Sequence, residues 1–125
     1  MSVIGDSTFI HSGITGIVEM VYNPPKTGHT VVILDNGTTA MTGLQEHPGT
    51  GRKLDHRKTN RVVIEDICRG AGVKNVQVFI LPGEADKFRD ELKKALASNA
   101  LSVLIARQLC ILAAPRARKL EQAQE

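Results

Sequence analysis

The sequence predicts an α/β domain built on an open, mainly parallel sheet flanked by helices. Short runs of β-branched and aliphatic residues alternate along the chain with stretches of helical periodicity, which is the pattern of a parallel sheet with crossover helices. The run at residues 29–34 is continuously apolar, as expected of a central strand covered on both faces. With 125 residues, of which 42% are hydrophobic and 23% charged, the chain can bury the core of one modest domain.

The first half of the chain contains two predicted strands, one helix and a long loop. Residues 2–5 are predicted to be a short buried strand, and 29–34 the second strand. Between them, the apolar residues of 9–22 recur on one side of a helix, which ends at the Pro- and Gly-containing segment 23–28. Residues 36–61 are rich in Gly, Thr, Pro, His and basic side chains; a loop of this length in a compact domain is usually functional.

The second half continues the alternation. Its predicted elements are a helix over 62–71, a strand over 76–81, a helix over 84–98 and a strand over 101–106. The helix over 84–98 is the clearest, with apolar residues at helical spacing, acidic residues near its start and Lys93 and Lys94 near its end. Residues 108–113 are predicted to be extended or strand-like. We therefore divide the chain into a domain over 1–113 and a polar, partly helical tail over 114–125.

Composition narrows the classes of ligand and compartment. A net charge of +3 and a pI of about 9.1 suit a polyanionic small molecule as well as nucleic acid. Aromatic residues make up only 3%, which argues against a single-strand binder that stacks bases, so nucleic acid is not the expected partner. Cys68 and Cys110 lie in apolar contexts without a CxxC pattern and are predicted to be buried thiols. Neither a signal peptide nor an apolar run of membrane-spanning length is evident, so we expect a cytoplasmic protein without a membrane partner.

Two polar motifs follow the first two predicted strands. Gly5-Asp6-Ser7-Thr8 comes after the first strand, and Asp35-Asn36-Gly37-Thr38 comes after the second, about thirty residues later. Ligands of open α/β sheets bind at the carboxyl ends of strands, so both loops can reach one ligand. Asp6 offers a carboxylate oxygen, Asn36 an amide oxygen and Thr38 a carbonyl oxygen, which are ligands that Mg²⁺ prefers beside phosphate. The pair predicts a magnesium–diphosphate site.

Each candidate side chain also has a structural interpretation. Asp6 can cap a helix, and Asn36-Gly37 is a common turn dipeptide; the two motifs in register favour magnesium. His11 is expected either to contact substrate or to be structural. His47 is expected on the substrate side or in loop packing, because no zinc pattern accompanies it. The basic run over 52–61 is expected to be a solvated loop, with contact to a partner protein as the alternative.

The motifs together resemble one family. The likeness covers the chain to about Leu112, and its most specific segments are 5–13, 32–36, 38–43, 47–49, 72–76 and 102–107. These segments are similar to the alpha subunit of indolepyruvate ferredoxin oxidoreductase, within the 2-oxoacid:ferredoxin oxidoreductases. The resemblance implies part of a thiamine diphosphate-binding fold, and the activity it implies for the assembled enzyme is oxidative decarboxylation of aryl 2-oxo acids to acyl-CoA with reduction of ferredoxin.

The resemblance also implies the roles of individual residues. Magnesium is expected at the side chains of Asp6 and Asn36 and at the Thr38 carbonyl. Ser7 and Thr8 are expected to meet the diphosphate at the start of a helix. The full expected cofactor-binding set is Gly5, Asp6, Ser7, Thr8, Asn36, Thr38, Ala40, Met41, Thr42 and Gly43. No catalytic residue is assigned, and iron–sulfur clusters are expected only in other regions or in a partner.

The chain departs from the family at several points. Leu44 replaces a polar residue, typically His, and Gly37 stands where a larger residue is common. The pyrimidine-binding region with its activating glutamate is absent, so we expect the chain to be inactive alone. Its expected partners are that missing region or the beta subunit, ferredoxin, a 2-oxo acid and coenzyme A. Two alternatives stay open: an inactive fragment or split subunit that acts only with a partner chain, and a phosphate- or nucleic-acid-binding module that uses residues 52–61.

Overall fold

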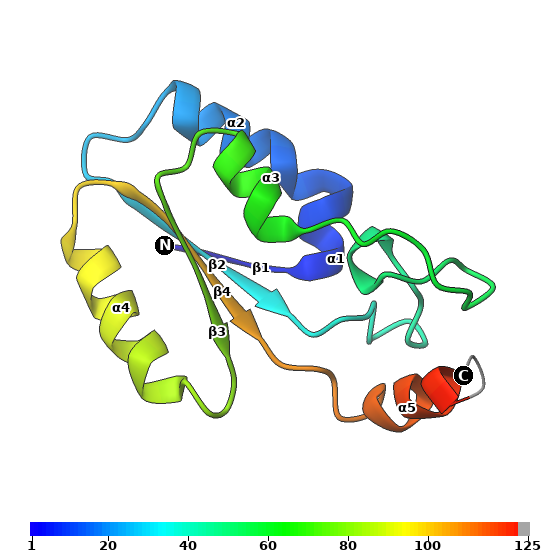
Figure 1. Cartoon of the computed structure of the whole chain (residues 1–125). Coiled ribbons are helices and arrows are strands. Elements are labelled where there is room, and N and C mark those ends of the chain that lie inside the picture. Colours follow the sequence, from blue (N-terminus) through cyan, green and yellow to red (C-terminus); the bar gives the residue numbers. More distant parts are fainter. Residues whose placement is uncertain (123–125) are drawn as a thin grey trace.

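A computed structural model describes residues 1–122 and confirms the predicted α/β fold (Figure 1). Four parallel strands form one sheet in the order β1-β2-β4-β3. The elements are β1 (Ser2–Gly5), α1 (Asp6–Thr8), η1 (Phe9–Gly13), α2 (Ile14–Tyr22), β2 (His29–Asp35), η2 (Pro48–Thr50), α3 (Ile64–Gly70), β3 (Asn75–Ile80), α4 (Ala85–Ala97), β4 (Leu101–Arg107) and α5 (Ala114–Gln122). Within the described residues, no helix has the length and apolar character needed to cross a membrane.

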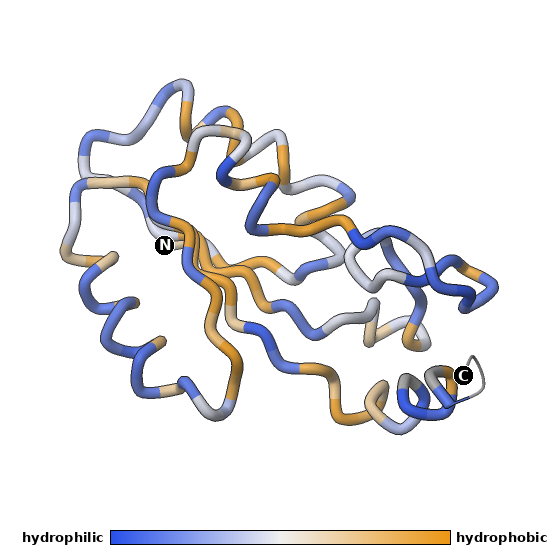
Figure 2. Tube along the Cα trace, in the orientation of Figure 1, coloured by the Kyte–Doolittle hydropathy of each residue, from blue (hydrophilic) through white to orange (hydrophobic). Residues whose placement is uncertain are grey.

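Helices lie on both faces of the sheet, which explains the largely apolar central strands (Figures 1 and 2). On one face, a cluster of buried side chains from the helices and the central strands includes Phe9, Ile17, Ile33, Ile64, Val103 and Ile105. On the other face, α4 packs against a smaller cluster that includes Leu104. Alternate residues of β4 therefore belong to the two clusters, as the two-residue period of a strand requires.

The chain does not add the strands in the order in which they lie in the sheet. After β2 the chain passes through α3 to the edge strand β3, and it then returns through α4 to β4, which pairs with both. Because α3 and α4 lie on opposite faces, the chain leaves the carboxyl ends of β2 and β3 toward different sides, and β4 lies between these two strands. Asp35 and Arg107 are partners in register at this point.

The first helical segment begins earlier than predicted, at Asp6 instead of residue 9. Gly5 is extended and Asp6 is the first helical residue; an acidic side chain is favourable there because it faces the positive end of the helix dipole. Residues 6–8 are mostly polar, so hydrophobic periodicity alone detects the segment only from Phe9. The segment is also not uniform, because Phe9–Gly13 forms a π-helical turn.

Two further predictions need correction. Residues 108–113 form no strand, since β2 ends at Asp35 and β3 ends at Ile80. The chain instead makes two bonds to the loop after β2, from Gln108 N to Asp35 O and from Cys110 N to Asn36 O, both 2.9 Å, and then turns. Cys110 is accordingly only half-buried, and the prediction of a second core thiol was wrong; Cys68 is fully buried as predicted.

The remaining bounds differ from the predictions by one or two residues. α3 begins at Ile64 because the preceding residue is extended, with φ −95° and ψ 111°. α5 occupies most of the predicted tail, and residues 123–125 of that tail lie outside the described residues.

Candidate functional site

Asp6 lies at the centre of the predicted site and joins three segments. Its carboxylate is 2% exposed. Oδ1 accepts a hydrogen bond from the Ser7 N–H at 2.9 Å, at the start of the helix. Oδ2 accepts one from the Gly37 N–H at 2.9 Å and one from His47 Nε2 at 3.2 Å. The loops after β1 and β2 therefore meet at one carboxylate, as the sequence predicts, together with the segment at η2, which the sequence did not connect to Asp6.

The hydrogen bonds keep this buried carboxylate charged. Burial by itself would raise the pKa of Asp6, but the bonds from His47, Ser7 and Gly37 outweigh it and hold the pKa below its usual value. The site thus contains a buried anion at neutral pH, held by two backbone donors and one imidazole. Such an anion can ligate a cation without first losing a proton.

His47 is buried between the Asp6 carboxylate and the turn that follows it. Its Nδ1 accepts a hydrogen bond from the Gly49 N–H at 3.1 Å, so the proton of the neutral ring is assigned to Nε2, which donates to Asp6. Side chains pack closely over Gly49, since a Cβ there would lie 2.8 Å from Ile10 Cδ1 and 3.0 Å from His47 Cε1. His47 is expected from the sequence either on the substrate side or in loop packing, and these contacts are loop-packing contacts.

The loop after β2 is organised by short-range bonds. Asn36 Oδ1 accepts from the Thr38 N–H at 3.1 Å, and Thr38 Oγ1 donates to the Gln45 carbonyl at 3.2 Å. Ser7 Oγ lies 2.8 Å from Thr39 Oγ1, which provides a second direct contact between the two loops. The structure therefore brings the loop at residues 36–38 beside Asp6 and Ser7. The other two residues of the first motif flank them, with Gly5 ending β1 and Thr8 ending α1.

The segment over Ala40–Gly43 does not join this cluster. It forms a turn closed by the bond from Thr39 N to Gln45 O at 3.0 Å and by the bond from Thr42 Oγ1 to Gln45 Oε1 at 2.8 Å. Met41 is fully exposed, so its side chain packs on none of the residues that the structure describes. A cofactor contact for Met41 therefore stays a prediction.

His11 reaches the same small cavity as His47. Its Nδ1 donates to the Ser7 carbonyl at 2.7 Å, and the ring is exposed. A cavity of about 250 Å³ is lined by both histidines, Pro48 and Arg52 among others. The two residues that the sequence predicts on the substrate side are thus neighbours, although they are 36 positions apart in the chain.

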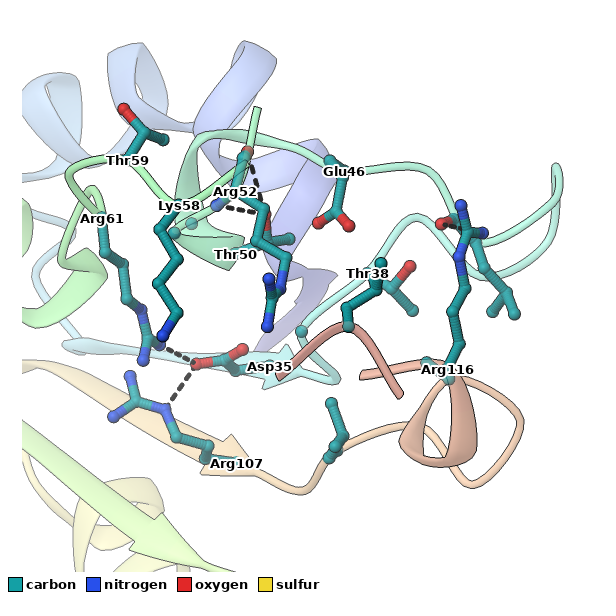
Figure 3. A pocket seen from close by; sticks show the side chains of 17 residues that line it. Asp35, Thr38, Glu46, Thr50, Arg52, Lys58, Thr59, Arg61, Arg107 and Arg116 are labelled. Carbon is teal, nitrogen blue, oxygen red and sulfur yellow. Dashed lines mark hydrogen bonds and ion pairs between the residues drawn. The ribbon is translucent and has the colours of Figure 1, made fainter. Parts of the chain in front are cut away.

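Sequence analysis missed a charged network at the ends of β2 and β4 (Figure 3). Asp35 is 4% exposed, and its Oδ2 accepts from Arg107 Nε at 2.5 Å and from Arg61 at 3.4 Å. Arg107 also holds Glu65 through two bonds, of 3.3 and 2.9 Å. Burial alone would raise the pKa of Glu65, but the bonds from Arg107 lower it below its usual value. The sequence signal that could have predicted this network was an acidic residue directly after one predicted strand and a basic residue directly after another.

The remaining metal-binding chemistry is limited. Within residues 1–122, no group of three or more His, Cys, Asp or Glu side chains could hold a metal ion. Burial raises the pKa of the Cys68 thiol to about 11, so it is a poor thiolate ligand. The donors that the two loops provide are oxygens, a set that fits Mg²⁺ completed by phosphate and water better than it fits a transition metal.

Comparisons with known proteins agree on one family. Residues 1–106 match the family described as thiamine pyrophosphate enzyme, C-terminal TPP binding domain. The chain is similar to indolepyruvate oxidoreductase subunit IorA of Archaeoglobus fulgidus, with 46% identity over 97% of this chain and 19% of the relative. It is also similar to the IorA subunits of Thermococcus kodakarensis, with 38% identity over 90% of this chain and 17% of the relative, and of Methanothermobacter marburgensis, with 38% identity over 90% and 18%. The chain therefore spans less than one fifth of the length of these relatives. No solved structure matches.

Proposed function

Since the chain belongs to the thiamine pyrophosphate enzyme family through its C-terminal TPP binding domain, we propose that it is the thiamine diphosphate- and magnesium-binding part of an indolepyruvate ferredoxin oxidoreductase. The proposed reaction of the assembled enzyme is oxidative decarboxylation of an aryl 2-oxo acid to its acyl-CoA with reduction of ferredoxin. The chain spans only 19% of its Archaeoglobus relative, so we propose that it acts with the remaining region or a partner subunit. Its cytoplasmic location remains a prediction.

The meeting of two strand-end loops at the charged carboxylate of Asp6 carries this proposal. A carboxylate oxygen has two acceptor positions. Oδ2 uses both, toward Gly37 and His47, whereas Oδ1 uses one, toward Ser7. Oδ1 therefore keeps a lone pair for a cation, and so does Asn36 Oδ1, which among the described residues accepts only the Thr38 N–H. The oxygen donors fit a magnesium ion that also binds diphosphate.

In this proposal each loop has a separate task. Asp6 and Asn36 hold magnesium through side-chain oxygens, and Thr38 holds it through its carbonyl. Ser7 and Thr8 bind the diphosphate at the start of the helical segment, where N–H groups and the helix dipole favour anions. Gly5 and residues 40–43 contact the remainder of the cofactor. Bound thiamine diphosphate supplies the electron sink that decarboxylation of a 2-oxo acid needs.

His47 is a positioning residue in this arrangement. By donating to Oδ2 it occupies that oxygen and leaves Oδ1 as the one available to a cation. The backbone donors of Ser7 and Gly37 fix the rotation of the carboxylate in the same way. The catalytic acid and the iron–sulfur clusters are assigned to the missing region or to partner chains.

Calorimetric titration with thiamine diphosphate, with and without Mg²⁺, tests the proposal. We expect the wild-type chain to bind the cofactor only when magnesium is present. Asp6→Asn keeps the shape of the side chain but removes its charge, and it should weaken this binding at least about tenfold. Asp90→Asn, on the exposed side of α4, is the matched control and should bind as the wild type does. Equal binding by Asp6→Asn, or no magnesium-dependent binding by a folded wild-type chain, would contradict the assignment of the site.

A further inference from the structure

We propose that a second cavity, on the other side of the Asp35–Thr38 turn, is a site for a phosphate-bearing small molecule. The cavity has a volume of about 460 Å³ and opens between the loop at 37–61, the end of β4 and α5 (Figure 3). Its basic lining residues are Arg52, Lys58, Arg61, Arg107 and Arg116. None of Asp6, Ser7 and Thr8 lines it, whereas Gly37 and Thr38 do, so the cavity and the predicted diphosphate site lie on the two sides of one loop.

The cavity carries an excess of positive charge. Among the described residues, five cationic side chains line it, against two carboxylates, those of Asp35 and Glu46. Arg107 is compensated, because it pairs with Glu65 as well as with Asp35. Arg61 shares the same Asp35 oxygen at the longer distance of 3.4 Å. The one buried carboxylate at the base of the cavity is therefore divided between two guanidinium groups.

Lys58 adds a charge that no carboxylate among the described residues neutralises. No carboxylate of the described residues lies within ion-pair distance of its amine, although the side chain extends toward Arg61 and Asp35 in Figure 3. Cations gathered in a partly enclosed space repel one another more strongly than they do in open solvent. A bound anion would relieve that repulsion, and guanidinium groups match the geometry of phosphate oxygens.

The shape favours a small molecule over a macromolecule. The cations converge on one cavity instead of spreading along a surface, and 460 Å³ falls within the range of about 300–1,000 Å³ typical of small-ligand sites. The cavity also lies at the carboxyl ends of β2 and β4, where Asp35 and Arg107 line it, and ligands of open α/β sheets bind at the carboxyl ends of strands. In the proposed function, coenzyme A is the reactant that carries phosphate groups, so we assign the cavity to coenzyme A. This identification rests on the proposed function.

Calorimetry of the full chain without magnesium tests the site. The probes are inorganic phosphate, pyrophosphate and adenosine 3′,5′-bisphosphate, which carries phosphates in the positions found in coenzyme A. We expect the last two to bind, and Lys58→Gln to weaken their binding by about fivefold or more. Lys93→Gln removes the same charge from the exposed side of α4 and should change nothing. Added salt should weaken the binding by screening. Stronger binding of the bisphosphate than of pyrophosphate would support the coenzyme A assignment, and the reverse order would support a diphosphate ligand.

Three results would overturn the proposal. The first is equal binding of the probes by the wild type and Lys58→Gln. The second is competition by thiamine diphosphate with magnesium, which would make the cavity part of the cofactor site. The third is Lys58-dependent binding of a single-stranded oligonucleotide without binding of the small anions. If thiamine diphosphate fails to bind while the bisphosphate binds in a Lys58-dependent manner, the proposed function fails and the second site stands.

Discussion

Replacement of His47 by Phe measures what the imidazole between Asp6 and Gly49 contributes to folding. Phe has a similar shape, so the substitution removes two hydrogen bonds and leaves little cavity. One lost bond is the donation from Nε2 to Asp6 Oδ2 at 3.2 Å, and the other is the acceptance by Nδ1 from the Gly49 N–H at 3.1 Å. Asp6 keeps its two backbone donors, whereas the buried Gly49 N–H loses its acceptor.

The structure sets the expected magnitude. A hydrogen bond to a charged group contributes roughly 1.5–3 kcal/mol, and an unsatisfied buried donor costs about 1–3 kcal/mol. Both contacts are buried, but the 3.2 Å bond is long, so we take the lower half of each range. We expect the free energy of unfolding to fall by about 3 kcal/mol, which for a chain of this size lowers Tm by on the order of 10 °C.

Urea unfolding at pH 7, followed by circular dichroism, measures the difference. The m-value should stay the same, because the change removes bonds and leaves the fold as it is. His29→Phe is the matched control: His29 is half-buried, and its ring bonds only to Ser2 Oγ, at 2.8 Å, among the contacts described. The free energy of unfolding of His29→Phe should be lower than that of the wild type by about 1 kcal/mol. If His47→Phe costs no more than the control, the buried Asp6–His47 contact does not stabilise the site and the reasoning is refuted.

Three other predictions address the sheet ends and the thiols. Glu65→Gln should lower the free energy of unfolding by about 1–2 kcal/mol at pH 7. Because the pKa of Glu65 is lowered in the folded state, its contribution is complete above the unfolded pKa of about 4.3 and is lost as pH falls through the folded pKa. The difference in stability between wild type and variant should therefore disappear in acid denaturation curves. Iodoacetamide at pH 8 should alkylate half-buried Cys110 in the native chain and leave Cys68 unmodified until denaturant is added, and equal rates would contradict the burial of Cys68. Gly28→Ala should cost more than about 2 kcal/mol, because φ is +72° there and a Cβ would lie 2.6 Å from backbone atoms; an unchanged urea midpoint would show that the turn can relax.

The strands and helices could be predicted because their signals are local. Residues 31–34 of β2 are apolar at every position, and such a run is typical of a central parallel strand. The helical spacing of its apolar residues predicts the helix over 84–98. Residues 108–113 look equally apolar, yet they form no strand, because the neighbouring strands have already ended and no partner remains to pair with.

The site could be predicted in part for the same reason. Asp6 and Asn36 each follow a predicted strand, and parallel strands bring their carboxyl ends to one edge. The contact between Asp6 and His47 spans 41 positions and passes through a loop without any periodic pattern, so no local rule could find it. The protonation of His47 at Nε2 depends in turn on the Gly49 N–H, which only the folded turn presents.

The sequence alone determined the α/β class, the position of each strand and the two polar motifs at strand ends, because those features depend on residues within a few positions of one another. Tertiary structure decided which residues share a site. It placed His47 against Asp6, and it gathered the basic run over 52–61 with Arg107 around Asp35. The physical reason is the strand order: β4 enters between β2 and β3, so Arg107 reaches Asp35 from 72 residues away. No pattern in the sequence specifies that insertion.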